Sequence, residues 1–149
     1  MGLSAAWRTL ARQDAVWAFD VDGTLVGSVR SDVLRPGAAA LLERLTRCGV
    51  ICVLWSAGGQ DYAQRMAIAH GIHPMVTACY AKQRSTGRLR YGVDHFALTH
   101  RPHVFVDDAP DDLPHDATVI AVPQFIGSNL ADRALWAVLD QLPTQAEPR

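Results

Sequence analysis

Two aspartates and a glycine stand where the first apolar run of the chain ends. Residues 15–19 have the composition of a buried strand, and Asp20, Asp22 and Gly23 follow them directly. Two neighbouring carboxylates repel each other, and a hard divalent cation such as Mg2+, which takes oxygen ligands, lets both stay ionised. The glycine permits a sharp turn and leaves room for a bound group. The alternative is a plain turn, since Asp and Gly are common in turns.

Apolar runs that alternate with helical patterns predict an α/β fold. The expected strands cover residues 15–19, 50–55, 76–80, 103–106 and 118–122, and the expected helices cover residues 37–47, 61–70, 93–99 and 130–142. Successive strand–helix units give parallel strands joined by right-handed crossovers. The pattern therefore predicts a Rossmann-like three-layer sandwich with a mainly parallel sheet of about five strands. A short hairpin is expected over residues 26–35.

Composition limits the function classes. The chain has 149 residues, 49% of them hydrophobic, and a net charge of -1, which suits one domain and gives no general attraction to nucleic acid or anionic membrane. Three cysteines without a framework spacing predict reduced thiols and a cytoplasmic protein. No apolar run is long enough to span a bilayer. We expect a helical extension over residues 1–14, a core domain over 15–142 and a disordered tail over 143–149.

The ends of the other predicted strands also carry residues that could do chemistry. Ser56 and Ala57 follow the second strand, and Asp107 and Asp108 follow the fourth. Lys82, the only lysine among 14 basic residues, follows the third. A lysine supplies a compact positive charge, although an exposed loop lysine is the plain alternative. Because the carboxyl ends of parallel strands share one edge of the sheet, we expect these groups to meet there.

With these residues in this order, residues 15–125 resemble the haloacid dehalogenase (HAD) superfamily. That family is marked by the motif DxDGT after its first strand, Ser or Thr after its second, a lysine, and an acidic motif after its fourth strand. Dehalogenase members lack the second aspartate, so Asp22 favours phosphoryl chemistry. The resemblance implies a HAD-like core without a cap domain, because residues 24–56 and 56–82 are too short to hold one.

The resemblance also implies roles for the acidic residues. Asp20 would be the nucleophile that forms an aspartyl-phosphate, and Asp22 the general acid and then the general base. Mg2+ would bind the Asp20 carboxylate, the Asp22 backbone carbonyl and Asp108. Residues expected to support this site, as a further ligand or by orienting the metal and its waters, are Asp107, Asp112 and Thr24.

The phosphate-binding residues implied by the family are Ser56, Ala57 and Lys82. The Ser56 hydroxyl and the backbone N–H groups of the following turn would bind phosphate oxygens. The family often has Asn at the position that Ala57 occupies, so side-chain contacts to the substrate differ here. Lys82 would bridge the nucleophile and the phosphate, with Arg84 or Arg101 as alternatives.

An open site suits a large substrate or a lid from an oligomer neighbour, and residues 26–35 would form its only flap. The leading hypothesis is a Mg2+-dependent phosphomonoesterase that acts on a phosphorylated small molecule or macromolecule. One alternative is a module that binds phosphorylated partners without turnover. Another is a polynucleotide 3'-phosphatase, which the basic residues Lys82, Arg84, Arg88 and Arg90 would serve, although a solvated hairpin is the favoured explanation of these residues. The six histidines lack zinc-site spacing and are expected in turns or on the surface.

Overall fold

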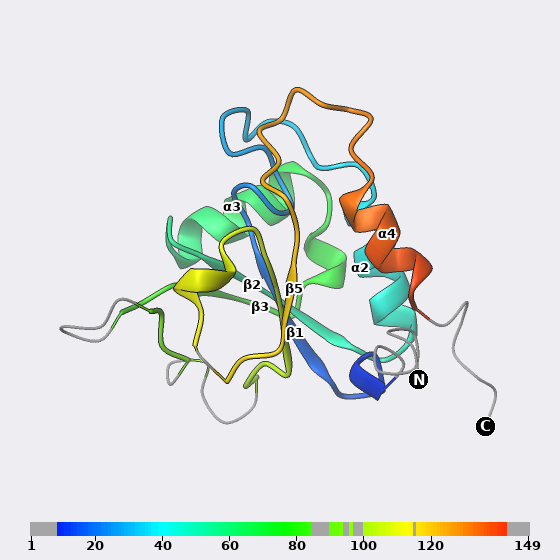
Figure 1. Ribbon diagram of the computed structural model, residues 1–149, viewed down its shortest axis with the longest axis vertical. Coiled ribbons are helices and arrows are strands. Elements are labelled where there is room, and N and C mark those ends of the chain that lie inside the picture. Colours follow the sequence, from blue (N-terminus) through cyan, green and yellow to red (C-terminus); the bar gives the residue numbers. More distant parts are fainter. Residues whose placement is uncertain (1–8, 85–89, 94–95, 97–99, 115, 143–149) are drawn as a thin grey trace.

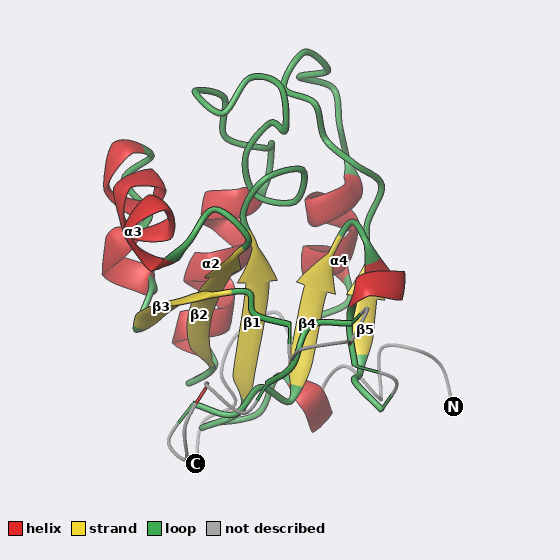
Figure 2. Cartoon of the chain, turned by 90° about the vertical axis from the view of Figure 1, so that its left-hand side faces the viewer, coloured by secondary structure: helices red, strands yellow, loops and turns green. Residues whose placement is uncertain are grey.

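A five-stranded parallel sheet forms the centre of the molecule (Figure 2). The computed structural model describes residues 9–84, 90–93, 96, 100–114 and 116–142. The strands lie in the spatial order β3, β2, β1, β4, β5. Their bounds are Val16–Asp20 (β1), Ile51–Ser56 (β2), Ala78–Ala81 (β3), Val104–Asp107 (β4) and Val119–Ala121 (β5). The predicted α/β class and parallel five-stranded sheet are confirmed, and each predicted strand overlaps the observed one.

Successive residues of each strand point to opposite faces of the sheet, so they enter two different cores. Trp17 and Phe19 enter a core on the face that carries the helices, and Ala18 and Trp55 enter a second core on the opposite face. Trp17 and Trp55 are both fully buried. Burial on both faces explains why the strands read as continuous apolar runs.

Helices cover one face of the sheet, and an aromatic segment covers the other. The helices are α2 (Ala38–Arg47), α3 (Gln60–Ala69) and α4 (Ala134–Asp140), and the short 3-10 helices are η1 (His73–Met75) and η3 (Pro110–Asp112). Figure 1 shows α2 and α4 side by side, in mutual contact. Tyr91, Phe96 and Leu113 pack on the second face. This layering is consistent with the Rossmann-like sandwich, and most of the helix predicted over 93–99 lies outside the described residues.

The last helix is shorter than predicted. It begins at Ala134, whereas the apolar pattern predicts a start at residue 130. Polar side chains bind the backbone ahead of it: the Asn129 side chain accepts from Ala131 N–H at 3.1 Å, and Asp132 accepts from Ala134 N–H at 3.1 Å. Such side-chain bonds compete with the helical ladder and mark a helix start. Within the helix Leu135 and Val138 are buried, and Leu139 is partly buried against the same core.

The hairpin predicted over residues 26–35 forms only in part. One isolated antiparallel bridge joins Val26 and Leu34, and no strand forms. Ser28 N–H donates to Phe125 O at 2.9 Å, and the N–H groups of Val29 and Arg30 both donate to the carbonyl of residue 126. The loop keeps part of its own pairing, since Gly27 N–H donates to Val33 O at 3.0 Å, but it also pairs with residues 125–126, which a local pattern does not reveal.

Several other predictions concern single features. All three cysteines carry unpaired thiols, as expected. Among the described residues no helix is both long and apolar enough to cross a bilayer. Thr9 and Leu10 are helical, and the rest of the predicted N-terminal helix, like the tail over 143–149, lies outside the described residues.

Candidate active site

Three carboxylates meet at the carboxyl edge of the sheet. Asp20 ends β1, Asp107 ends the neighbouring parallel strand β4, and Asp108 follows it. One carboxylate oxygen from each lies within 4.8 Å of the others. Asp20 and Asp107 are buried, and Asp108 is partly exposed. Among the described residues no other group of three or more acidic, cysteine or histidine side chains converges in this way.

The single lysine binds two of these carboxylates. Lys82 Nζ donates to Asp20 Oδ1 at 2.7 Å and to Asp107 Oδ2 at 2.9 Å, and its side chain is only 6% exposed. β3 pairs with β2 in parallel, so the residue after its end arrives at the same edge as Asp20. The plain reading of an exposed loop lysine is therefore wrong. Arg84 instead lies over the Tyr91 ring at 4.0 Å.

Asp107 and Asp108 differ in what their oxygens bind. Asp107 Oδ1 accepts from Ala109 N–H at 2.8 Å while its Oδ2 accepts from Lys82, so both of its oxygens have donors. The hydroxyl of Thr24 lies 2.9 Å from Asp20 Oδ2 and 3.2 Å from Asp108 Oδ1. A hydroxyl has one proton and donates to one acceptor at a time. Asp20 and Asp108 thus share a single donor, and their oxygens suit a hard divalent cation.

The charges of the cluster are unbalanced. Burial raises the pKa of Asp20 to about 8, because the attraction of Lys82 is smaller than the desolvation cost and Asp107 adds repulsion. Burial likewise raises the pKa of Asp107 against the opposing effect of Lys82. For Lys82, burial lowers the pKa, but the charges of Asp20 and Asp107 outweigh it and the net shift is upward. Lys82 therefore stays protonated, and a further cation beside Asp20 and Asp108 would balance the remaining negative charge.

Gly23 lets the Asp108 carboxylate approach the backbone. Its φ is +83°, and a Cβ at this position would lie 2.4 Å from Asp108 Oδ2. Both observations require glycine, the first by conformation and the second by space. The carboxylate of Asp108 is thus seated against the turn that follows Asp22.

We expect Gly23→Ala to weaken the fold and also the Mg2+ binding that the sequence predicts for this cluster. The left-handed φ costs about 1 kcal/mol for alanine, and the displaced Asp108 should lower Mg2+ affinity by about 10-fold or more. The matched control is Gly71→Ala, because Gly71 has a φ of +70° and nothing within 4 Å of the added Cβ. Denaturant unfolding and calorimetric Mg2+ titration measure the two effects. Equal Mg2+ affinity in the two variants would contradict the role of Gly23 in seating Asp108.

The turn after β2 offers donors to an anion. Ser56 is buried, and its Oγ accepts from Gly58 N–H at 3.0 Å, so its own proton can be donated elsewhere. Gly59 N–H is bonded to Ser56 O, whereas the N–H of Ala57 donates to no described residue. Because Asp20 pairs with Trp55 in the β1–β2 ladder, this turn begins beside the end of β1. Ser56 and Ala57 thus lie as the sequence predicts.

Asp22 has a partner that sequence reasoning missed. The hydroxyl of Tyr62, in the first turn of α3, donates to Asp22 Oδ1 at 2.5 Å. Burial raises the pKa of Tyr62 to about 12, with the carboxylate of Asp22 adding to the shift. The phenol therefore remains a hydrogen-bond donor at neutral pH. The only local signal was an aromatic residue six positions after Ser56, near the start of the next helix.

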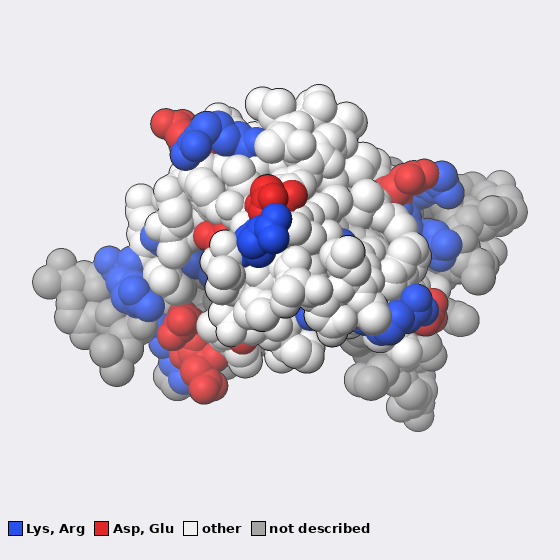
Figure 3. All heavy atoms as spheres, turned by 90° about the horizontal axis from the view of Figure 1, so that it is seen from above, with Lys and Arg blue, Asp and Glu red and all other residues white. Residues whose placement is uncertain are grey.

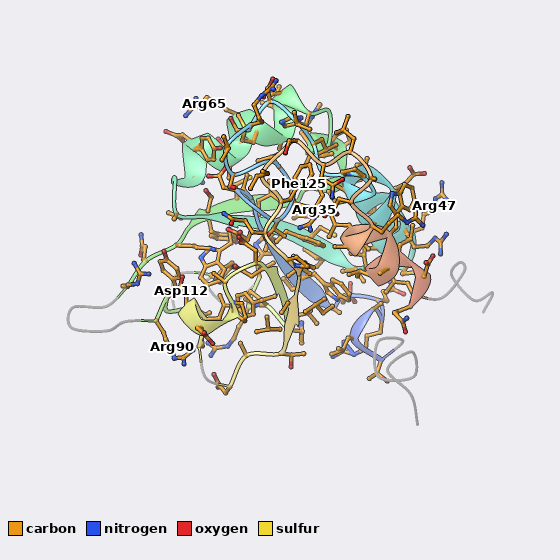
Figure 4. The ribbon with its side chains drawn as sticks, turned by 45° about the horizontal axis from the view of Figure 1, so that its top comes forward. Arg35, Arg47, Arg65, Arg90, Asp112 and Phe125 are labelled. Carbon is orange, nitrogen blue, oxygen red and sulfur yellow. The ribbon has the colours of Figure 1, made fainter. Side chains whose placement is uncertain are left out.

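Arg35 binds the backbone of the first motif, and no local sequence pattern indicates this role. Its guanidinium is fully buried and donates to the carbonyls of Gly23 and Thr24 at 3.3 and 3.4 Å. Its other edge makes two bonds to Asp132, at 2.8 and 3.0 Å. Figure 4 shows Arg35 next to Phe125, whose ring centroid lies 5.4 Å from the guanidinium carbon. Asp132, 97 positions after Arg35, thus holds the arginine that binds the turn carrying Gly23 and Thr24.

Other predicted site residues lie apart from this cluster. Asp112 does not join the group of three carboxylates, and Figure 4 shows it toward Arg90, away from Arg35. Arg90 donates to Leu113 O at 2.7 Å. Gln83 and Gly92 form an antiparallel bridge, which supports the hairpin reading of the basic segment, although residues 85–89 lie outside the described part.

The described histidines lie outside the candidate metal group, and the surface charges are scattered (Figure 3). None of the described histidines belongs to a group that could hold a metal. His103 Nδ1 accepts from Val16 N–H at 2.9 Å, and His70 bonds to the Ser31 carbonyl. Seen from the end of the molecule where the loops lie, the described basic and acidic side chains form small groups and no broad basic patch (Figure 3).

The segments that could hold a cap domain are short. Residues 24–56 form a loop, α2 and β2, and residues 57–81 form α3, η1 and β3. Neither adds a domain over the carboxylates. Scans of the chain against models of protein families and against curated proteins found no match. Assignment of a function therefore depends on the geometry of these residues.

Proposed function

We propose that this protein is a Mg2+-dependent phosphomonoesterase of the HAD type with Asp20 as its nucleophile. The observation that carries the proposal is the bridge of Lys82 between Asp20 and Asp107, with Asp108 beside Asp20 across the Thr24 hydroxyl. A carboxylate held next to a buried cation, at an edge that also offers amide and hydroxyl donors, suits attack on phosphorus.

Two carboxylates suit the metal best. Asp20 and Asp108 would hold Mg2+, together with the backbone carbonyl of Asp22, while Asp107 orients Lys82 and is not a ligand. When bound, the metal would neutralise negative charge on the phosphoryl group as it is transferred. The charges support this choice, because among the described residues the only ammonium bound to Asp20 is that of Lys82, which Asp107 shares, and the Thr24 hydroxyl between Asp20 and Asp108 is neutral.

The chain's own residues would carry the steps. The Asp20 carboxylate attacks phosphorus and the ester P–O bond breaks, while Asp22 gives its proton to the leaving oxygen. Asp22 then takes a proton from water, whose oxygen attacks the phosphorus of the aspartyl-phosphate, and phosphate leaves with Asp20 restored. Lys82, the Ser56 hydroxyl and the Ala57 N–H would hold the phosphate oxygens during both steps.

The open edge of the sheet bears on the size of the substrate, and the cysteines bear on the cellular compartment. With no cap domain between residues 24 and 81, we propose a substrate that is large or a lid that comes from a second subunit. The three unpaired thiols favour the cytoplasm as the compartment. The phosphatase reading is favoured over a non-catalytic module because nucleophile, cation and candidate acid are all present together.

The direct test is phosphate release from 4-nitrophenyl phosphate and a panel of phosphorylated metabolites, peptides and DNA ends. We expect release that needs Mg2+ and stops with EDTA. Rapid acid quenching of the reaction with labelled substrate should leave label on the protein, and hydroxylamine should remove it, as it does from acyl phosphates. Phosphate release that persists unchanged in EDTA would contradict the metal site, and label that resists hydroxylamine would contradict the aspartyl-phosphate.

A further inference from the structure

The hydrogen bond between Tyr62 and Asp22 joins two elements of the site. Asp22 lies in the loop after β1 and is partly exposed, so one side of its carboxylate can reach a substrate. Tyr62 comes from α3, and its hydroxyl lies 2.5 Å from Asp22 Oδ1. This bond uses one carboxylate oxygen and leaves the other, Oδ2, without a donor among the described residues.

The ring of Tyr62 is fixed by its surroundings. A Cβ at Gly58 would lie 2.8 Å from Tyr62 Cδ2, so the ring packs against the turn that follows β2. The guanidinium of Arg65 lies over the ring at 5.6 Å. The Ser31 carbonyl, in the loop that follows Asp22, is held by His70 Nε2 at 2.8 Å. The hydroxyl is therefore presented to Asp22 from a fixed direction.

We propose that Tyr62 is the positioning residue for Asp22, which makes Oδ2 the oxygen that exchanges a proton with the leaving group. This role depends on the proposed phosphomonoesterase function. A protonated carboxyl carries its proton on one oxygen, and an oxygen that already accepts a short hydrogen bond is the less favourable place for it. The phenol thus fixes the orientation of the Asp22 carboxyl group and leaves Oδ2 as the reactive oxygen. Residues that hydrogen-bond to metal ligands orient those ligands in the same way.

The consequence depends on the leaving group. An alkoxide needs a proton as it departs, whereas 4-nitrophenolate departs without much help, so general acid catalysis matters far more for the alkyl ester. A misplaced Asp22 should therefore slow alkyl phosphates selectively. Loss of packing or of phosphate binding would slow both kinds of substrate alike.

The experiment compares Tyr62→Phe with the matched control Tyr80→Phe, which removes a phenol bonded to His100 Nδ1 at 2.6 Å on the other face of the sheet. Each variant and the wild type are assayed with 4-nitrophenyl phosphate and an alkyl phosphate under saturating Mg2+. We expect kcat/KM of Tyr62→Phe to fall about 10- to 100-fold for the alkyl ester and less than about 3-fold for the aryl ester. Tyr80→Phe should show no such split, and thermal melting confirms that both variants fold.

The outcomes separate the two proposals. Equal losses with both esters in Tyr62→Phe, or the same split in Tyr80→Phe, would overturn the role of Tyr62 while phosphatase activity stands. A wild type that hydrolyses neither ester with Mg2+ would overturn the proposed function and this role with it.

Discussion

Asp20→Asn is expected to lower Mg2+-dependent phosphate release by about 10^4-fold or more, the scale seen when a nucleophile is removed. An amide oxygen is too weak a nucleophile to attack phosphorus, and no acyl phosphate can form on it. Asparagine has the shape of aspartate, so the contacts with Thr24 and Lys82 have room to persist. The measurement is phosphate release with saturating Mg2+ from the best substrate of the panel.

Stability distinguishes lost chemistry from lost structure in this variant. Burial raises the pKa of Asp20 to about 8, so its ionised form is unfavourable in the metal-free protein. Removing the ionisable group should leave metal-free stability equal to that of the wild type or higher, as denaturant unfolding in EDTA can show. Asp111→Asn is the matched control, since Asp111 is exposed in η3 and should keep full activity. Equal rates in Asp20→Asn and the wild type would remove the aspartyl-phosphate from consideration.

Asp132→Ala should destabilise the fold by about 3 kcal/mol, because it leaves the buried guanidinium of Arg35 without its counter-charge. The Arg35 side chain is 0% exposed and that of Asp132 is 14% exposed, so little water can replace the lost carboxylate. The same carboxylate accepts from Ala134 N–H at the start of α4, and that bond is lost as well. Denaturant unfolding at neutral pH measures the change.

The control for this ion pair is an exposed one. Arg30 and Asp32 form a bidentate pair with side chains 61% and 68% exposed, and Asp32→Ala should leave stability unchanged within error. If Asp32→Ala lowered the free energy of unfolding as much as Asp132→Ala does, burial of the charge would not be the cause of the destabilisation.

The cost of Asp132→Ala should also depend on pH. Burial opposes ionisation of Asp132, but its hydrogen bonds to Arg35 outweigh this and the net effect lowers its pKa. A carboxyl with a lowered pKa in the folded state contributes its full stability above the pKa of the unfolded chain, about 3.9, and loses it as pH falls through the folded pKa. The difference in the free energy of unfolding between wild type and Asp132→Ala should therefore become smaller below about pH 4. A gap of constant size down to pH 2 would contradict ionisation of Asp132 as its source.

The amino-acid sequence alone predicted the sheet and the edge at which chemistry could occur. Apolar runs buried on both faces are a local property, and strands joined by helices must run parallel, so their carboxyl ends coincide. Asp20, Ser56 and Asp107 each stand at such an end, and their convergence followed from topology without any knowledge of side-chain conformations. Lys82 stood out because it is the only lysine in the chain, and it too follows a predicted strand.

Only the tertiary structure decided which groups pair with which. Lys82 binds Asp107 and leaves Asp108 beside Asp20, a choice made by strand register and side-chain direction. Tyr62 reaches Asp22 across 40 residues and Arg35 reaches Asp132 across 97, and no local pattern encodes such contacts. Periodicity reports which face of an element is buried, whereas hydrogen bonds between distant segments depend on how those elements pack in space.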